Sequence, residues 1–168
     1  MKNYSSSSLE QTREIAKQWL STLVATNEVT SESDITESKG ATIVGLSGHL
    51  GAGKTAFVKM VARWLGIKDE ITSPTYVIMK IYDLDSNIYN QILQAIPNPW
   101  KRLIHIDAYR LERYEELEVL NWEQLVRDPG NLIMVEWPEN AEIDKNKNPN
   151  MIQLEFCIRE SMYEIIEN

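Results

Sequence analysis

Apolar residues recur along the chain with two spacings, one typical of amphipathic helices and one of buried strands. From residue 9 to residue 24 they follow helical spacing, and the serines just before this segment can form a capping box. A second helical pattern, residues 57–65, ends before Gly66. Short apolar runs predict four buried strands, at residues 41–46, 76–82, 103–106 and 132–135.

The segments between these elements are more polar. Residues 26–40, rich in Ser, Thr and Glu, predict a surface loop, and residues 83–101 predict a short helix within a long connection. A charged helix is expected at residues 114–126. From Ile152 to Ile158 apolar residues alternate with polar or small ones, and a second short run ends at Ile166, which predicts two antiparallel edge strands.

The segment from Gly48 to Thr55 carries the most specific chemistry. It matches the pattern of glycine, four residues, glycine, lysine and then serine or threonine, with an apolar strand before it and an amphipathic helix after it. In such a loop the backbone N–H groups cradle phosphate, Lys54 reaches the outer phosphates, and the Thr55 hydroxyl binds magnesium. The residues expected to contact the nucleotide here are His49, Leu50, Gly51, Ala52, Gly53, Lys54, Thr55 and Ala56.

This loop and the alternation of strands with helices together predict the fold class. We expect one domain, residues 1–168, with a three-layer P-loop NTPase-like α/β fold. Its central sheet would be mainly parallel, with helices on both faces and antiparallel strands at the edge.

Two acidic residues are candidates for the metal and water environment beside the loop. Asp107 follows the apolar run 103–106, and Glu136 follows the run 132–135. Both would lie at the carboxyl edge of the sheet, where P-loop enzymes place such a group. Asp107 is assigned to the metal shell and Glu136 to positioning or activating water, while a simple solvent-facing strand end remains the alternative for each.

The nucleotide base is expected to be adenine. Guanine recognition of the Ras type requires Asn-Lys-x-Asp, and the nearest match, residues 146–149, ends in Pro149. We therefore expect ATP and Mg²⁺ as the ligands.

Composition limits the other classes of function. The chain has 168 residues, 43% of them hydrophobic, so it can bury a core without a disulfide or a structural metal. A single cysteine, Cys157, and the lack of an apolar run of about 18 residues predict a cytoplasmic protein with no membrane contact. The formal net charge of −8 argues against a free-standing nucleic-acid binder, unless charge is segregated onto one face.

Four motifs in order resemble the TsaE family, formerly called YjeE. They are the loop 48–55, Ser-Pro-Thr-Tyr at 73–76, His-Ile-Asp-Ala-Tyr-Arg at 105–110 and Glu-Trp-Pro-Glu at 136–139. The resemblance covers most of the chain. It implies a bacterial ATPase, slow alone and dependent on partners, that supports threonylcarbamoyladenosine (t6A) formation at tRNA position 37 with the TsaD and TsaB proteins. Contact with tRNA would be indirect, through that complex.

The resemblance also implies roles for single residues. Lys54 would neutralise the transferring phosphate, Thr55 would hold magnesium, and Asp107 and Glu136 would complete the metal and water environment. Thr75 would face the γ-phosphate as a switch residue.

The resemblance leaves three aromatic or cationic residues open. Trp137 would pack beside the nucleotide, although an ordinary buried or interface tryptophan is an equal alternative. Tyr109 and Arg110 remain divided between nucleotide contact, partner contact and structural pairing.

The sequence departs from the family pattern at His49, where aspartate is usual, and in the long connection 83–101. Two other functions stay open. One is a small-molecule kinase that clamps its acceptor with Arg102, Arg110 and Arg113. The other is a binding module that ATP regulates with negligible turnover.

Overall fold

The computed structural model describes residues 2–29, 40–68, 71–74, 76–85, 99–159 and 162–168. Its strands are β1 (Lys2–Ser6), β2 (Thr42–Gly48), β3 (Met79–Asp83), β4 (Arg102–Asp107), β5 (Asn131–Glu136), β6 (Ile152–Arg159) and β7 (Met162–Glu167). The α-helices are α1 (Leu9–Val29), α2 (Lys54–Trp64) and α4 (Trp122–Arg127), and the 3₁₀ helices are η1 (Ala108–Arg110), η2 (Tyr114–Leu120) and η3 (Pro138–Ala141).

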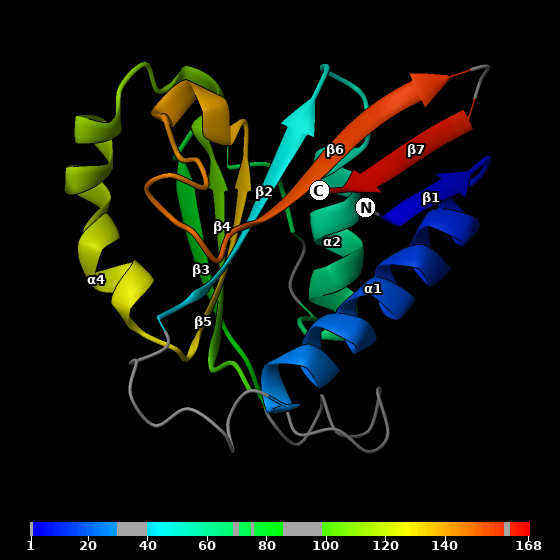
Figure 1. The fold of residues 1–168 in the computed structure, drawn as a ribbon, viewed down its shortest axis with the longest axis horizontal. Helices are drawn as coiled ribbons and strands as arrows, with labels where there is room; N and C mark the ends of the chain where they lie inside the picture. The colour runs from blue at the N-terminus through cyan, green and yellow to red at the C-terminus, as the bar shows by residue number, and fades with distance from the viewer. Residues whose placement is uncertain (1, 30–39, 69–70, 75, 86–98, 160–161) are drawn as a thin grey trace.

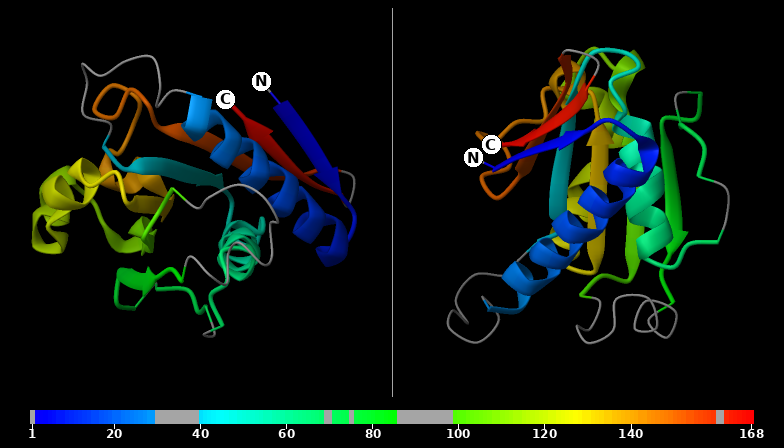
Figure 2. Two further views of the ribbon diagram at one scale, coloured as in Figure 1. Left: turned by 90° about the horizontal axis from the view of Figure 1, so that it is seen from below. Right: turned by 90° about the vertical axis from the view of Figure 1, so that its right-hand side faces the viewer.

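The seven strands form one sheet in the order β1-β7-β6-β2-β5-β4-β3. The four central strands, β6, β2, β5 and β4, are mutually parallel, and the pairs β6–β7, β7–β1 and β4–β3 are antiparallel. The two ends of the chain lie side by side, because Lys2 on β1 is in register with Glu167 on β7 (Figure 2). The predicted fold class, a mainly parallel centre with antiparallel edge strands, is confirmed.

Both faces of the sheet are covered by helices, which gives three layers (Figure 1). The strands β4 and β5 bury apolar side chains on both faces, as expected of a parallel sheet covered on both sides, whereas β6 alternates apolar with polar residues. Leu103, Leu132 and Met134 pack toward α1 and α2, whereas Ile104 and Ile133 pack toward η2 and α4. The alternation of strand side chains therefore divides the core into two clusters, one on each face.

One prediction at the sheet edge was wrong, and one edge strand was not predicted. The strand at residues 152–158 is not an antiparallel edge strand, because β6 pairs in parallel with β2 on one side and antiparallel with β7 on the other. The outermost strand on that side is β1, at residues 2–6, for which the sequence shows no apolar alternation. It is a short polar strand that exists by pairing with β7.

Two element boundaries also differ from the prediction. Helix α1 continues to Val29, so residues 26–29 are helical rather than part of a loop. The strand predicted from residue 76 begins only at Met79, because the backbone N–H groups of Val77 and Ile78 both bond to the Pro74 carbonyl and form a turn. The short helix predicted within residues 83–101 falls largely on residues outside those the structure describes.

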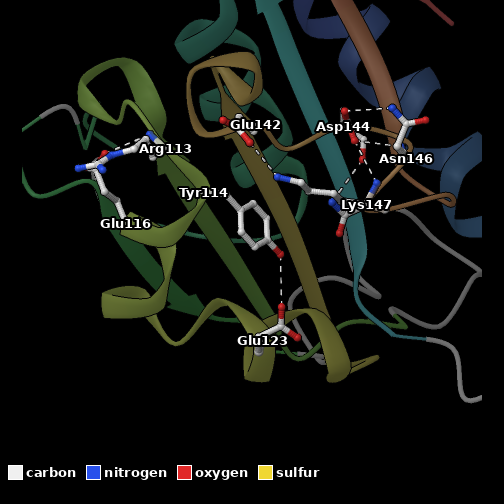
Figure 3. Close-up of polar contacts among 9 residues, drawn as sticks. Arg113, Tyr114, Glu116, Glu123, Glu142, Asp144, Asn146 and Lys147 are labelled. Atoms are coloured by element: carbon white, nitrogen blue, oxygen red, sulfur yellow. Dashed lines mark hydrogen bonds and ion pairs between the residues drawn. The ribbon is translucent and has the colours of Figure 1, made fainter.

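The charged helix predicted at residues 114–126 is two helices, η2 and α4. Asn121 separates them, with a left-handed φ of 57° that no continuing right-handed helix allows. Glu116 caps the first of the two by accepting from the backbone N–H of Arg113 (Figure 3).

An aromatic cluster joins α1, α2 and β6. The Phe57 ring lies edge-on to Trp19 at 5.4 Å and to Phe156 at 5.5 Å between ring centroids, and Phe57 is fully buried. We predict that Phe57→Ala lowers the free energy of unfolding by about 3–5 kcal/mol, since it removes both ring contacts and leaves a cavity. Urea denaturation would measure the change.

The control for this experiment is Val119→Ala, on an 85% exposed side chain outside the core. It should change the free energy of unfolding by no more than about 0.5 kcal/mol. Equal losses from the two variants would show that the aromatic cluster does not hold these elements together.

Candidate functional site

The carboxyl ends of three parallel strands meet beside the loop that follows β2. Leu46 on β2 is in register with Glu136 on β5, and Glu136 is in register with Asp107 on β4. The two acidic residues are therefore neighbours at one edge of the sheet. Each is the last residue of its strand, as the sequence pattern indicated to within one position.

A pocket of about 410 Å³ opens between the loop and these strand ends. It is lined by Leu50, Gly51, Gly53, Lys54, Thr55, Ala56, Ser73, Asp107, Tyr109, Glu136 and Trp137. Most of the residues predicted to bind nucleotide or metal therefore share one cavity. His49 and Ala52 belong to the loop but do not line the pocket, and Thr75 lies outside the residues that the structure describes.

A chain of hydrogen bonds links Thr55, Glu136 and His105. The Thr55 hydroxyl lies 2.8 Å from both carboxylate oxygens of Glu136. His105 Nε2 lies 2.8 Å from Oε1 of the same carboxylate. Glu136 and His105 are 3% and 0% exposed, so this carboxylate is held from the pocket side and from the core side at once.

Asp107 has a separate set of partners. Its Oδ2 accepts from the Ser73 hydroxyl at 2.9 Å, and its Oδ1 accepts from the backbone N–H of Tyr109 at 3.1 Å. The second bond caps the 3₁₀ helix η1 that follows β4. Asp107 thus ties the end of β4 to the segment 71–74, whereas Glu136 is the acid in contact with Thr55.

Lys54 begins α2 and is 4% exposed. Its Nζ donates to the carbonyls of Gly48 at 2.6 Å and His49 at 2.9 Å, and it lies 3.8 Å from the centroid of the Trp137 ring. Burial lowers the pKa of the Lys54 ammonium below its ordinary value, and the neighbouring carboxylates, Glu136 foremost, oppose that shift.

Trp137 follows Glu136 with a φ of 57°, a left-handed conformation that non-glycine residues adopt at a cost. Its backbone N–H still bonds to the Leu46 carbonyl, at 3.1 Å. The turn brings the indole over Lys54 and within 5.3 Å of the Tyr109 ring, measured between centroids. The structure therefore gives Trp137 a place in the pocket wall rather than in the core.

A second, smaller pocket of about 160 Å³ adjoins the other side of the loop. Its walls come from the loop, the start of α1, β6 and β7, and its lining is Leu9, Thr12, Gly51, Ala52, Gly53, Ala56, Phe156, Tyr163 and Ile165. Apart from Thr12 and the Tyr163 hydroxyl, the side chains of this lining are apolar. The two pockets share Gly51, Gly53 and Ala56, so a ligand lying over the loop would reach both.

The sequence nearest to a guanine motif lies outside both pockets. Lys147 pairs with Glu142 at 3.0 Å and lies over the Tyr114 ring, and the Asn146 side chain bonds to Asp144 (Figure 3). These side chains stabilise an exposed turn. They contribute nothing to the walls of the phosphate-loop pocket.

The oxygen donors of the pocket suit a magnesium ion that is bound together with a nucleotide, rather than a metal ion that protein side chains alone would hold. Among the residues that the structure describes, no group of three or more His, Cys, Asp or Glu side chains is arranged to hold a metal ion. Mg²⁺ bound with a nucleotide needs only one or two carboxylates and a hydroxyl, because phosphate and water oxygens complete its shell. Thr55, Glu136 and Asp107 supply donors of this kind at one wall.

Sequence reasoning missed the part that His105 plays. His105 belongs to the 105–110 motif, yet no role was assigned to it. It lies two residues before Asp107 in the same strand, so both side chains leave the sheet on the same face. That spacing was the available signal that His105 lies directly beneath the strand-end acids.

Comparison with protein families gives one match over nearly the whole chain. The sequence profile described as "Threonylcarbamoyl adenosine biosynthesis protein TsaE" matches residues 6–164.

Three curated relatives are named "tRNA threonylcarbamoyladenosine biosynthesis protein TsaE". The chain is 36% identical to that of Borreliella burgdorferi over 96 residues, which are 57% of this chain and 59% of the relative. It is 35% identical to that of Treponema pallidum over 99 residues, 59% of this chain and 62% of the relative. For Streptomyces coelicolor the identity is 29% over 124 residues, with 73% and 74% covered. The matched segments thus span about three fifths of the length of the first two relatives.

A solved structure shares the fold. The structure titled "Crystal structure of Bacillus subtilus YdiB" superposes with a TM-score of 0.58 at 22% identity, and the match covers 99% of this chain and 83% of that one. At this identity the likeness concerns the fold alone.

The loop geometry predicts different costs for two glycine substitutions. Gly48 has a φ of 130°, and a Cβ there would collide with the Phe156 carbonyl oxygen of the paired strand β6. Gly51 has a φ of 80°, and a Cβ would meet nothing within 4 Å. We expect Gly51→Ala to cost about 1–2 kcal/mol through backbone strain alone, and Gly48→Ala to cost clearly more.

Thermal and urea unfolding of the two variants would measure this difference. Gly51→Ala serves as the matched control, because it changes the same residue type in the same loop. A loss in Gly48→Ala no greater than in Gly51→Ala would contradict the close packing of the loop against β6.

Proposed function

This chain belongs to the TsaE family, and from this premise we propose that it is an ATPase that binds ATP with Mg²⁺ and supports t6A formation in tRNA. The observation that carries the proposal is the contact between the Thr55 hydroxyl and the buried Glu136 carboxylate, beside a loop of the phosphate-binding pattern. A hydroxyl and a carboxylate at the mouth of such a loop are the protein groups that a magnesium–nucleotide complex requires.

Each residue of the pocket has a role in this proposal. Backbone N–H groups from residue 49 to residue 56 would cradle the phosphates, and the N-terminus of α2 adds its positive end to them. Lys54 would exchange its carbonyl acceptors for phosphate oxygens, which are stronger acceptors because they are charged. Thr55, Glu136 and Asp107 would hold the Mg²⁺.

The magnesium, when bound, would neutralise charge that develops on the phosphates. Glu136 would also orient the attacking water, and Asp107 would share this environment through its position beside Glu136. Thr75 is proposed as the residue that faces the γ-phosphate, since the described segment 71–74 just before it is bonded to Asp107 through Ser73. Trp137 would cover the phosphates from the side of the pocket that it lines.

The second pocket is proposed as the site of the adenine base. It borders the same glycines as the phosphate pocket, and its volume and apolar walls suit a flat aromatic ring. Tyr163 on β7 lies near the loop, since a Cβ on Gly53 would meet its ring at 3.9 Å. Stacking on Tyr163 or Phe156 would select for a base without reading its edge, and Thr12 is placed to supply a polar contact.

We propose TsaD and TsaB as the partners, and contact with tRNA only through their complex. The names of the curated relatives refer to tRNA threonylcarbamoyladenosine biosynthesis. The net charge of −8 opposes direct binding of a nucleic acid, so a partner would carry the tRNA. Leu50 and Tyr109, at 82% and 51% exposure, rim the pocket with apolar surface that a partner protein could cover.

We place the protein in the cytoplasm, where tRNA is modified. Within the part of the chain that the structure describes, every helix is too short or too polar to cross a bilayer.

The three arginines that a small-molecule kinase would use to clamp its acceptor make other contacts, away from the pocket. Arg102 pairs with Asp128 at 2.6 Å at the start of β4, the end of the strand remote from the pocket. Arg110 lies over the Tyr76 ring, and the backbone of Arg113 is part of the cap of η2. None of the three lines the pocket, so this set offers no clamp for a phosphoryl acceptor.

The first test is ATP turnover by the chain alone and with TsaB, TsaD and tRNA added. Turnover should rise with the partners, and Lys54→Ala and Glu136→Ala should each lower it by about 10²–10³-fold, because each removes a charge placed at the reacting phosphates. Lys147→Ala and Glu123→Gln are matched controls, since both residues are bonded to exposed neighbours outside the pocket. Turnover indifferent to the partners would favour the kinase or the regulated binding module instead.

A second test separates the base from the phosphates. Tyr163→Ala should weaken ATP binding by about 5–100-fold, the effect of losing one stacking contact, and leave the affinity for inorganic triphosphate unchanged. Met162→Ala, on the adjacent residue of β7 whose side chain is absent from the pocket lining, is the control. Calorimetry would measure the affinity for ATP and for inorganic triphosphate. An equal loss of affinity for the two ligands would contradict the assignment of the second pocket to the base.

A further inference from the structure

His105 is the most buried polar side chain next to the pocket, and the proposed function does not use it. It is fully buried on β4, on the same face of the sheet as Leu103, which packs toward α2. Its strand neighbour in register is Met134, two residues before Glu136. The contact from His105 Nε2 to Glu136 Oε1 therefore runs diagonally across two parallel strands, 2.8 Å long, beneath the floor of the pocket.

Hydrogen-bond chemistry fixes the direction of this contact. A carboxylate oxygen can only accept, so the proton of the bond must be on His105 Nε2. The other ring nitrogen, Nδ1, is buried and has no hydrogen-bond partner among the described residues. A proton on Nδ1 would be buried without an acceptor, which makes the Nε2–H tautomer the one that fits this site.

The same bond restricts the Glu136 carboxylate. The terminal torsion of a glutamate side chain is broad, so a carboxylate held by one partner can rotate. Glu136 has two partners on different sides, Thr55 from the pocket and His105 from the core. With both partners in place, rotation of the Glu136 carboxylate about its terminal bond is restrained more than either partner alone would restrain it.

We propose that His105 is a positioning residue that orients the Glu136 carboxylate for the magnesium–nucleotide complex. The proposal rests on the proposed function for the identity of that ligand. His105 touches neither nucleotide nor metal. Its effect passes through Glu136, as outer-shell hydrogen bonds to carboxylate ligands do in metal sites.

The first experiment needs no ligand. The chain contains two histidines, His49 and His105, so an imidazole ¹⁵N spectrum shows two sets of signals, and His49→Ala identifies which belongs to His105. We expect the Nε2–H tautomer for His105, with a proton that exchanges slowly with water. In Glu136→Ala the resonance of the His105 Nε2 proton should shift, and this proton should exchange faster with water. The Nδ1–H tautomer, or a signal that ignores Glu136→Ala, would overturn the proposal.

The second experiment measures the dependence of nucleotide binding on magnesium. His105→Leu should raise the Mg²⁺ concentration for half-maximal ATP binding by about 10- to 100-fold and leave metal-free ATP binding unchanged. His105→Gln should recover most of the loss, because its amide N–H can donate to the same oxygen. Ile104→Val, on the opposite face of the same strand, is the control for a change within the β4 core.

The outcomes distinguish this proposal from the proposed function. If the native chain binds no magnesium–ATP, the proposed function fails, while the ¹⁵N spectrum still reports whether His105 holds Glu136. If the native chain binds it and His105→Leu shows the native magnesium dependence, or loses metal-free binding to the same extent, His105 does not act by positioning. Should His105→Leu fail to fold, His105→Gln and the ¹⁵N spectrum of the native chain decide the question.

Discussion

Parallel pairing of β2, β5 and β4 is the constraint on which the site depends. Because the three strands run in the same direction, their carboxyl ends share one edge of the sheet, where the loop after β2 also begins. The register then places Leu46, Glu136 and Asp107 directly beside one another on adjacent strands. A shift of register by one residue would turn both acids to the opposite face and leave the loop without a carboxylate.

That register also explains how four polar side chains can be buried next to each other. Lys54, His105, Asp107 and Glu136 are each at most 4% exposed, which would be costly for any of them without partners. The acids accept from Thr55, His105, Ser73 and a backbone N–H, and Lys54 donates to two loop carbonyls. Each group is therefore bonded before any ligand arrives, and the pocket is organised by its own polar contacts.

The sequence was sufficient for the elements with a strong local pattern. The phosphate loop, α2 and the strands β2, β4 and β5 have clear apolar runs, most of them bounded by glycine, and all lie close to the predicted positions. Their order along the chain then locates Asp107 and Glu136 at one edge. The elements that sequence reasoning missed depend on contacts between distant segments.

Three cases show why such contacts cannot be predicted from the local sequence pattern. Strand β1 is polar and is a strand only because β7 lies beside it, so no periodicity identifies it. The break at Asn121 depends on a left-handed residue that ordinary helix propensity does not forbid, since asparagine tolerates that conformation. His105 is a third kind of case, because a histidine inside an apolar strand has the same local pattern whether it holds a carboxylate or packs in the core.

Trp137 shows how the fold couples the acid to the lysine. The chain leaves β5 directly after Glu136 through a residue with positive φ, a conformation that costs about 1–3 kcal/mol and persists only where surrounding contacts hold it. Here the contacts are the bond to the Leu46 carbonyl, the Tyr109 ring and the Lys54 ammonium. One turn therefore fixes both the end of β5 and the position of the indole over Lys54. A movement of Lys54 toward phosphate would change its contact with Trp137 and, because Trp137 is bonded directly to Glu136, would act on the position of that acid.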